Sequence, residues 1–171
     1  MQEFCEQFAS FLTTHGIPKE IVIFIISMCP VLECRLGMVT GIGILQMPVW
    51  ESFIICFIGN ILPIPFILLL INKIFEWLKK IPGVQKPIIW LEQKTLKKRD
   101  KIDKYGVWGL LLFVAIPLPG TGAWTGSLLA SLLNLDRKKS FGVISMGVLI
   151  ATILMLIISK VFQTAVFGFS V

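Results

Sequence analysis

Glu33 and Arg35 are the charged residues of this 171-residue chain that lie deep inside a long apolar stretch. A charge at the centre of a membrane helix costs about 2.5 to 3.5 kcal/mol on insertion scales, so such residues are functional candidates. Residues two positions apart do not face each other on a regular helix. Pro30 and Gly37 flank the pair and predict an interruption, where Glu33 and Arg35 either pair or each reach toward an opposing segment.

A second interruption has the sequence PLPGTGAW and carries no charge. Its two prolines lack backbone N–H groups and fix φ, so we expect them to end the incoming helix. Its two glycines permit turn conformations and close backbone approach. The threonine between them is expected to cap the outgoing helix. The candidate residues of this second interruption are Pro117, Pro119, Gly120, Thr121, Gly122 and Trp124.

The helices that follow the two interruptions would begin near the middle of a membrane, with their N-termini toward the interior. Helix N-termini attract anions through their free N–H groups and the helix dipole. Together with Arg35, they predict a site for a phosphate or another anionic headgroup. Glu33 would then either pair with Arg35 in the empty state or carry a proton coupled to the substrate. The same carboxylate could instead attract an organic cation.

Composition excludes a soluble enzyme, because 56% of the residues are apolar and only 15% are charged, against about 25% charged in ordinary soluble domains. The sequence holds no H-E-x-x-H motif, nucleophile elbow or P-loop, so neither an enzyme activity nor a cofactor is expected. The four cysteines lack metal-binding spacing and are expected to pack as small apolar residues. Ser27 has no evident base partner and is expected to have a polar packing role. The basic residues are concentrated in one segment, which argues against nucleic-acid binding.

Four apolar stretches, at residues 21–47, 50–71, 107–133 and 141–162, predict an all-α integral membrane protein. The second and fourth stretches, at about 22 residues and 33 Å each, are long enough to cross a hydrocarbon core of about 30 Å. Pro63 and Pro65 should kink the second, where Asn60 needs a polar partner. The first and third are interrupted in the middle, so each is either a broken spanning helix or a hairpin that returns to the side it entered from.

Charge favours the hairpin. Residues 73–104 hold ten Lys and Arg and four Asp and Glu, a net charge of +6, and residues 136–139 carry +2. Cytoplasmic loops collect Lys and Arg, and these two segments fall on one side only if the third stretch turns back. We therefore expect a multi-pass protein of the cell membrane with cytoplasmic basic loops and both termini outside. The basic segment either binds anionic lipid headgroups or is a solvated helix that only sets the topology.

An internal repeat follows from this arrangement. Residues 1–72 (hairpin 20–47, transmembrane helix 50–72) and residues 105–171 (hairpin 106–134, transmembrane helix 140–162) form two inverted units of one membrane domain, joined by the basic amphipathic linker 73–104. Phe4, Phe8, Phe11 and Leu12 predict an amphipathic interfacial helix at the amino end. The spacings Gly37/Gly41 and Gly147/Ala151 predict close helix packing, either within one protomer or between two copies in a homodimer.

The ExR sequence of the first interruption, with Pro30, Glu33, Arg35 and Gly37, and the string AIPLPGTGAWTGSLLASLL from Ala115 to Leu133 resemble the putative small multi-drug export protein family. The architecture also resembles the wider DedA superfamily, which has two opposed re-entrant hairpins and is implicated in moving lipids or in proton-linked transport. These resemblances imply a transporter-like membrane protein with its site between the hairpin tips.

Three functions remain open at this point. The first is a transporter or flippase that moves an amphipathic substrate, in particular a phosphate-bearing lipid, by alternating access. The second is a proton-coupled multidrug exporter that uses Glu33 as its cation and proton site. The third is a membrane scaffold that transports nothing, in which Glu33 and Arg35 only stabilise the fold.

Overall fold

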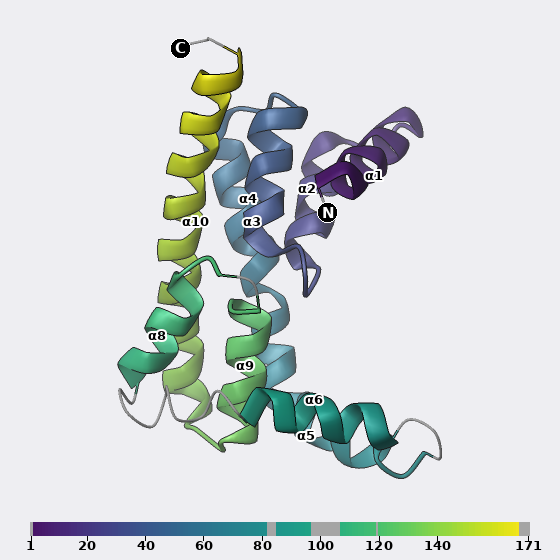
Figure 1. Ribbon diagram of the computed structural model, residues 1–171, viewed down its shortest axis with the longest axis vertical. Coiled ribbons are helices and arrows are strands. Elements are labelled where there is room, and N and C mark those ends of the chain that lie inside the picture. Colours follow the sequence, from purple (N-terminus) through teal and green to yellow (C-terminus); the bar gives the residue numbers. More distant parts are fainter. Residues whose placement is uncertain (1, 82–84, 97–106, 119, 168–171) are drawn as a thin grey trace. The chain divides into compact units, whose positions relative to one another are not determined.

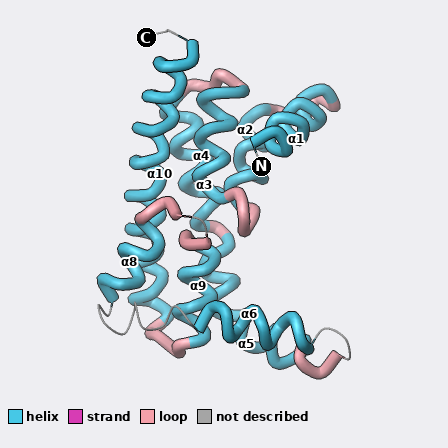
Figure 2. The backbone as a smooth tube through the Cα atoms, viewed as in Figure 1, coloured by secondary structure: helices cyan, strands magenta, loops and turns pink. Residues whose placement is uncertain are grey.

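The computed structural model describes residues 2–81, 85–96, 107–118 and 120–167 (Figure 1). Within these ranges the secondary structure is helical and contains no strand (Figure 2), which confirms the all-α prediction. The elements in chain order are α1 (Gln2–Thr14), α2 (Lys19–Met28), α3 (Glu33–Met38), the π-helix η1 (Val39–Ile44), α4 (Val49–Ile61), α5 (Pro63–Leu78), α6 (Gln85–Leu96), α8 (Val107–Ala115), α9 (Ala123–Leu132) and α10 (Arg137–Phe167).

Two helical segments of the described chain are long and apolar enough to cross a membrane, Val49–Leu78 and Arg137–Val161. They cover the two stretches predicted to span. The first divides where the prolines were predicted to kink it: α4 ends at Ile61, and α5 starts at Pro63. A proline at the first helical position is tolerated because its missing N–H would have no partner there.

The chain divides into two compact units. The first unit comprises Met1–Leu62 and Val148–Val171, and it contains α1 to α4 and the C-terminal part of α10. The second unit comprises Pro63–Gly147, with α5, α6, α8, α9 and the start of α10. Each predicted broken stretch is a helix–break–helix segment inside one unit, α2–α3 in the first and α8–α9 in the second. The inverted repeat, its boundaries and the re-entrant placement in a membrane stay predictions.

Close packing in the first unit depends on glycines that face α2 and α4. A Cβ atom on Gly41 would lie 2.8 Å from Ser52 Oγ, and one on Gly37 would lie 2.9 Å from Cys56 Sγ and collide with Ser27 Oγ. Successive turns of α3 and η1 therefore meet successive turns of α4 in antiparallel order. The Gly37/Gly41 spacing thus packs helices within the protomer.

In the second unit, α9 and α10 pack closely against Val114 of α8. A Cβ atom on Gly126 of α9 would lie 2.6 Å from Val114 Cγ2, and one on Gly147 of α10 would lie 2.8 Å from Val114 Cβ. Helix α9 also packs against α5, where Asn72 Nδ2 donates a 3.1 Å hydrogen bond to the carbonyl of Ser131. Glycines at these positions let the backbones of α9 and α10 approach a single β-branched side chain of α8.

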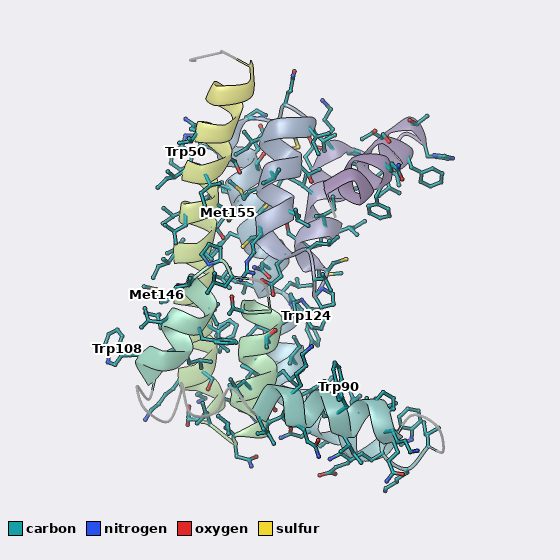
Figure 3. All side chains as sticks on the ribbon, viewed as in Figure 1. Trp50, Trp90, Trp108, Trp124, Met146 and Met155 are labelled. Carbon is teal, nitrogen blue, oxygen red and sulfur yellow. The ribbon has the colours of Figure 1, made fainter. Side chains whose placement is uncertain are left out.

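Large apolar side chains are exposed along the spanning helices, as lipid-facing helices require and water-soluble proteins avoid. In the first unit they include Ile54, Ile58, Ile153, Leu154 and Ile157, and in the second Phe66, Leu69 and Leu70. Four tryptophans are also exposed, Trp50, Trp77, Trp90 and Trp108, three of which Figure 3 labels. Tryptophan is enriched where a membrane meets water.

The predicted amphipathic segment at the amino end is helical, as α1. Phe8 and Leu12 pack against the core of the first unit and Ala9 is fully buried, whereas Phe11 is 59% exposed and its ring lies 4.3 Å from that of His15. Phe11 therefore does not share the packed face of Phe8 and Leu12. The side chain of Phe4 lies outside the described residues.

Candidate functional site

Pro30 ends α2 and determines the backbone conformation of the first interruption. A residue before proline is pushed away from the helical region, and Cys29, which follows the last residue of α2, has φ −70° and ψ 139°. After a short turn, the chain re-enters a helix at Glu33, whose backbone N–H donates a 3.1 Å hydrogen bond to the carbonyl of Cys29. Pro30 is exposed, and the neighbouring Val31 is 70% exposed.

Glu33 combines two unfavourable features. Its backbone has φ +50°, in the left-handed region, which costs a residue with a side chain on the order of 1–3 kcal/mol. Its side chain is only 3% exposed, while Arg35 is half-buried. A buried carboxylate on strained backbone is the kind of cost that proteins retain at functional sites. The buried member of the predicted charged pair is therefore the acid.

Several polar side chains are buried in the helices of the first unit, two of them beside Cys34, the residue after Glu33. The Cys34 thiol lies beside the Thr152 hydroxyl of α10 and the Asn60 amide of α4. Thr152 Oγ1 donates a 2.7 Å hydrogen bond to the carbonyl of Val148. We call the set of Ser27, Glu33, Cys34, Asn60 and Thr152 the polar seam; each of these residues is at most 3% exposed.

Some oxygens of the first unit have no hydrogen-bond partner among the described residues: Ser27 Oγ, Thr40 Oγ1, Ser52 Oγ and Asn60 Oδ1. Ser27 Oγ has the Cys56 thiol beside it, but not at hydrogen-bond geometry. A buried polar group left without a partner costs about 1–3 kcal/mol, and native proteins carry few of them. The first unit therefore holds buried oxygens with unused hydrogen-bonding capacity, and those of Ser27 and Asn60 belong to the polar seam.

Sequence reasoning found only part of this seam. Asn60 was expected to need a partner, because it lies in the middle of a spanning stretch. Ser27 and Cys34 were expected only to pack, and Thr152 gave no signal beyond being a small polar residue in an apolar helix. Their grouping depends on the packing of α2, α3, α4 and α10, which the spacing of residues within one helix does not reveal.

The second interruption is a tight loop between α8 and α9. Thr121 Oγ1 lies 2.8 Å from the Leu118 carbonyl and 2.9 Å from the Ile116 carbonyl, and the Leu118 N–H donates to it at 3.3 Å. The prediction that Thr121 caps the outgoing helix is wrong, since its hydroxyl closes the loop and Gly122 is the N-cap residue, with no side-chain cap.

The glycines of this loop are required by its backbone. Gly120 has φ +77° and Gly122 has φ +120°, conformations that residues with a side chain rarely adopt. Gly122 is buried and Gly120 exposed, while Pro117 and Trp124 are half-buried. Pro119 lies outside the described residues. The predicted residues of each interruption thus fall together within their own unit, and their convergence into one site stays a prediction.

The atoms of the polar seam that could bind a cation are mainly oxygens. Within the described part of the chain there is no group of three or more His, Cys, Asp or Glu side chains able to hold a metal ion. One carboxylate with amide and hydroxyl oxygens suits an organic cation or a hard monovalent ion better than a transition metal.

These features define a helical integral membrane protein with a buried charged residue at an interrupted helix. The chain belongs to the putative small multi-drug export protein family, whose family model matches residues 33–154, more than two thirds of its length. The match begins at Glu33 and includes both α4 and the second interruption. Comparison with curated proteins and with solved structures gave no match, so the resemblance to the DedA superfamily carries no further argument.

Proposed function

We propose that this protein is a membrane transporter that exports amphipathic organic cations, with Glu33 as the charged group that binds them. The observation that carries this proposal is the burial of the Glu33 carboxylate at the interrupted helix, beside a half-buried Arg35. A carboxylate in a low-dielectric environment attracts an organic cation more strongly than it would in water. The membership in a family named for small multi-drug export agrees with such a substrate class.

The depth of the site supports this role. The Asn60 amide lies beside the thiol of Cys34, the residue after Glu33. Along α4, Asn60 is ten residues from the exposed Trp50. At 1.5 Å per residue this is about 15 Å, half of a hydrocarbon core of about 30 Å. Val31 is exposed next to the turn. An amphipathic compound dissolved in the lipid would therefore meet apolar surface first and the carboxylate beyond it.

The second interruption supplies the opposing half of the proposed site. Gly120, Thr121 and Gly122 form the loop between α8 and α9, in which Gly120 is exposed, and Trp124 follows in the first turn of α9. Aromatic faces attract cations. In this proposal the two interruptions face each other as re-entrant hairpins, and the membrane domain works by alternating access, as inverted-repeat transporters do.

A flippase for phosphate-bearing lipids is the second candidate, and Arg35 is the residue that favours it. Its side chain is half-buried and so can reach a headgroup that does not enter the polar seam. Arginine recognises phosphate through paired donors. In this case the anionic group would bind at Arg35, and Glu33 would release Arg35 when a substrate arrives.

The orientation proposed for the protein follows from its charges. The basic loops would lie in the cytoplasm and both termini outside, in the cell membrane. In α6, Lys94 Nζ lies 4.5 Å from the centre of the exposed Trp90 ring, and Lys86 is also exposed. A tryptophan and lysines on one exposed helix fit a lipid interface, so we propose that α6 binds anionic headgroups.

The test is export of ethidium, a fluorescent organic cation, from cells or vesicles that contain the protein. Glu33→Gln should abolish export, because it removes the buried negative charge and keeps the side-chain shape. Glu51→Gln is the matched control: Glu51 is an exposed carboxylate in the first turn of α4 of the same unit, and export should persist.

Arg35→Ala separates the two candidates. A cation exporter keeps its activity without Arg35, whereas a flippase loses transbilayer movement of a labelled polyprenyl phosphate in liposomes. Unchanged ethidium export in Glu33→Gln would contradict the proposed exporter.

A further inference from the structure

The aromatic residues of α4 lie on one stripe of the helix. Trp50, Phe53 and Phe57 are spaced by three and four residues, which places them on the same face of an α-helix. The ring centroids of Trp50 and Phe53 are 6.3 Å apart with the planes at 76°, and those of Phe53 and Phe57 are 6.3 Å apart with the planes at 10°. Aromatic pairs prefer such edge-to-face and offset parallel arrangements. We call these three residues the aromatic track.

The aromatic track leads from the surface of the first unit to the polar seam. Trp50, labelled in Figure 3, is 74% exposed, and Phe53 and Phe57 are half-buried. Asn60 continues the same spacing three residues beyond Phe57, is 1% exposed, and has its amide beside the Cys34 thiol. Burial therefore increases along one stripe over about 15 Å, from an exposed indole to a member of the seam.

Contact with lipid does not account for this separation of side chains. The neighbouring exposed face of α4 carries the aliphatic residues Ile54 and Ile58, which are 53% and 49% exposed. The three aromatic residues of α4 lie on the stripe beside them. Aliphatic and aromatic side chains are both compatible with lipid, so lipid exposure gives no reason to place them on different stripes.

Aromatic rings offer a cation something that aliphatic side chains lack. The face of a ring carries negative potential and attracts a cation, although the ring has no net charge. A charged side chain at the same depth would be expensive to insert into the membrane. A row of rings therefore lowers the cost of moving a positive charge between the exposed end of α4 and the seam, and a planar aromatic cation also gains stacking.

We propose that the aromatic track binds planar aromatic cations on their way out of the polar seam, and that Phe53 and Phe57 make the protein select such cations over aliphatic ones. This inference rests on the proposed export function and narrows its substrate class. In the orientation proposed above, the Trp50 end of α4 lies at the outer face. A tetraalkylammonium ion carries the same charge, but alkyl groups shield that charge and provide no ring to stack.

The test compares ethidium, a planar aromatic cation, with tetrapropylammonium, an aliphatic one. Purified full-length protein in detergent would be titrated with ethidium by fluorescence, and export of ethidium and of radiolabelled tetrapropylammonium would be measured in cells. Phe57→Leu keeps an apolar side chain and removes the ring. It should weaken ethidium binding and raise the KM for ethidium export about threefold or more, and leave tetrapropylammonium export unchanged.

Three further variants separate the ring from its surroundings. Phe57→Tyr keeps the ring and should retain the ethidium affinity of the wild type. Phe53→Leu should act like Phe57→Leu, and its melting temperature would be recorded because Phe53 also packs against the core of the first unit. Phe66→Leu is the matched control, since Phe66 is a 59% exposed phenylalanine of α5 in the second unit, and its ethidium affinity should equal that of the wild type.

Unchanged ethidium affinity in both Phe53→Leu and Phe57→Leu would overturn the aromatic track, as would an equal loss of ethidium and tetrapropylammonium export. A loss in Phe57→Tyr as large as that in Phe57→Leu would also overturn it, because the ring would then not be the feature that binds. Ethidium export that requires Glu33 but neither phenylalanine would leave the proposed function standing without the track. Saturable ethidium binding that weakens in Phe57→Leu, in a protein that exports neither cation, would contradict the proposed function and keep the track as a binding surface.

Discussion

Glu33 carries most of the functional argument at the scale of single residues. Its carboxylate is buried and its backbone is in the left-handed region, so two separate costs fall on one residue. A structural turn needs neither, as Gly120 and Gly122 demonstrate in the second interruption. The acidic side chain at Glu33 is therefore best explained by what it binds.

The strain at Glu33 predicts how two substitutions differ. Glu33→Gly and Glu33→Ala both remove the carboxylate and should both lose ethidium export. Glycine adopts φ +50° without a Cβ penalty, so Glu33→Gly should be more stable than Glu33→Ala by roughly 0.5 to 1 kcal/mol, after allowance for the greater freedom of unfolded glycine. Melting temperatures of the two purified variants check this order. Greater stability of the alanine variant would mean that the left-handed backbone is not strained.

At the scale of elements, the molecule depends on helices that approach closely at glycines. In the first unit Gly37 and Gly41 let α3 and η1 pack against Ser27, Cys56 and Ser52. In the second unit α8, α9 and α10 meet at Val114. Such contacts fix the register between neighbouring helices, and the register decides which polar side chains share a point.

The contacts of Val114 predict a selective rescue. Gly126→Ala would place its Cβ 2.6 Å from Val114 Cγ2, an atom that Val114→Ala removes. Gly147→Ala would place its Cβ 2.8 Å from Val114 Cβ and 3.2 Å from the Leu111 carbonyl, which remain. Each glycine variant should lose about 1–3 kcal/mol of stability by overpacking. Val114→Ala should restore much of this loss in Gly126→Ala but not in Gly147→Ala, as double-mutant melting curves would measure. Equal rescue of both would contradict the described packing.

At the scale of the whole molecule, the distribution of charge predicts the course of the chain through the membrane. Two described segments can span, and two broken segments are either spanning helices or hairpins. The positive-inside rule favours hairpins, because it places residues 73–104 and 136–139 on one side.

Labelling of introduced cysteines tests this course. In a background with the native cysteines replaced by alanine, Lys80→Cys and Lys138→Cys should react with a membrane-impermeant thiol reagent only after the cells are opened, whereas Glu51→Cys should react in intact cells. All three positions are exposed. Labelling of Lys80→Cys and Lys138→Cys from opposite sides would show that residues 107–133 span.

The sequence by itself determined the class of protein, the two spanning stretches and the places where helices break. The length and hydropathy of an apolar stretch and the conformational limits of proline and glycine depend only on residues close in sequence. They can therefore be recognised without the tertiary structure. The sequence also identified Glu33 as a candidate, because a charge in a long apolar stretch can be recognised without knowledge of the fold.

Only the tertiary structure decided that Glu33 is more buried than Arg35, that Thr121 closes its loop, and that Ser27, Cys34, Asn60 and Thr152 are all buried in the first unit, with Asn60 and Thr152 beside Cys34. These residues come from four helices, far apart in sequence. Their meeting depends on the register with which the helices pack at glycines, and register is a property of the packed faces that the spacing within any single helix does not encode.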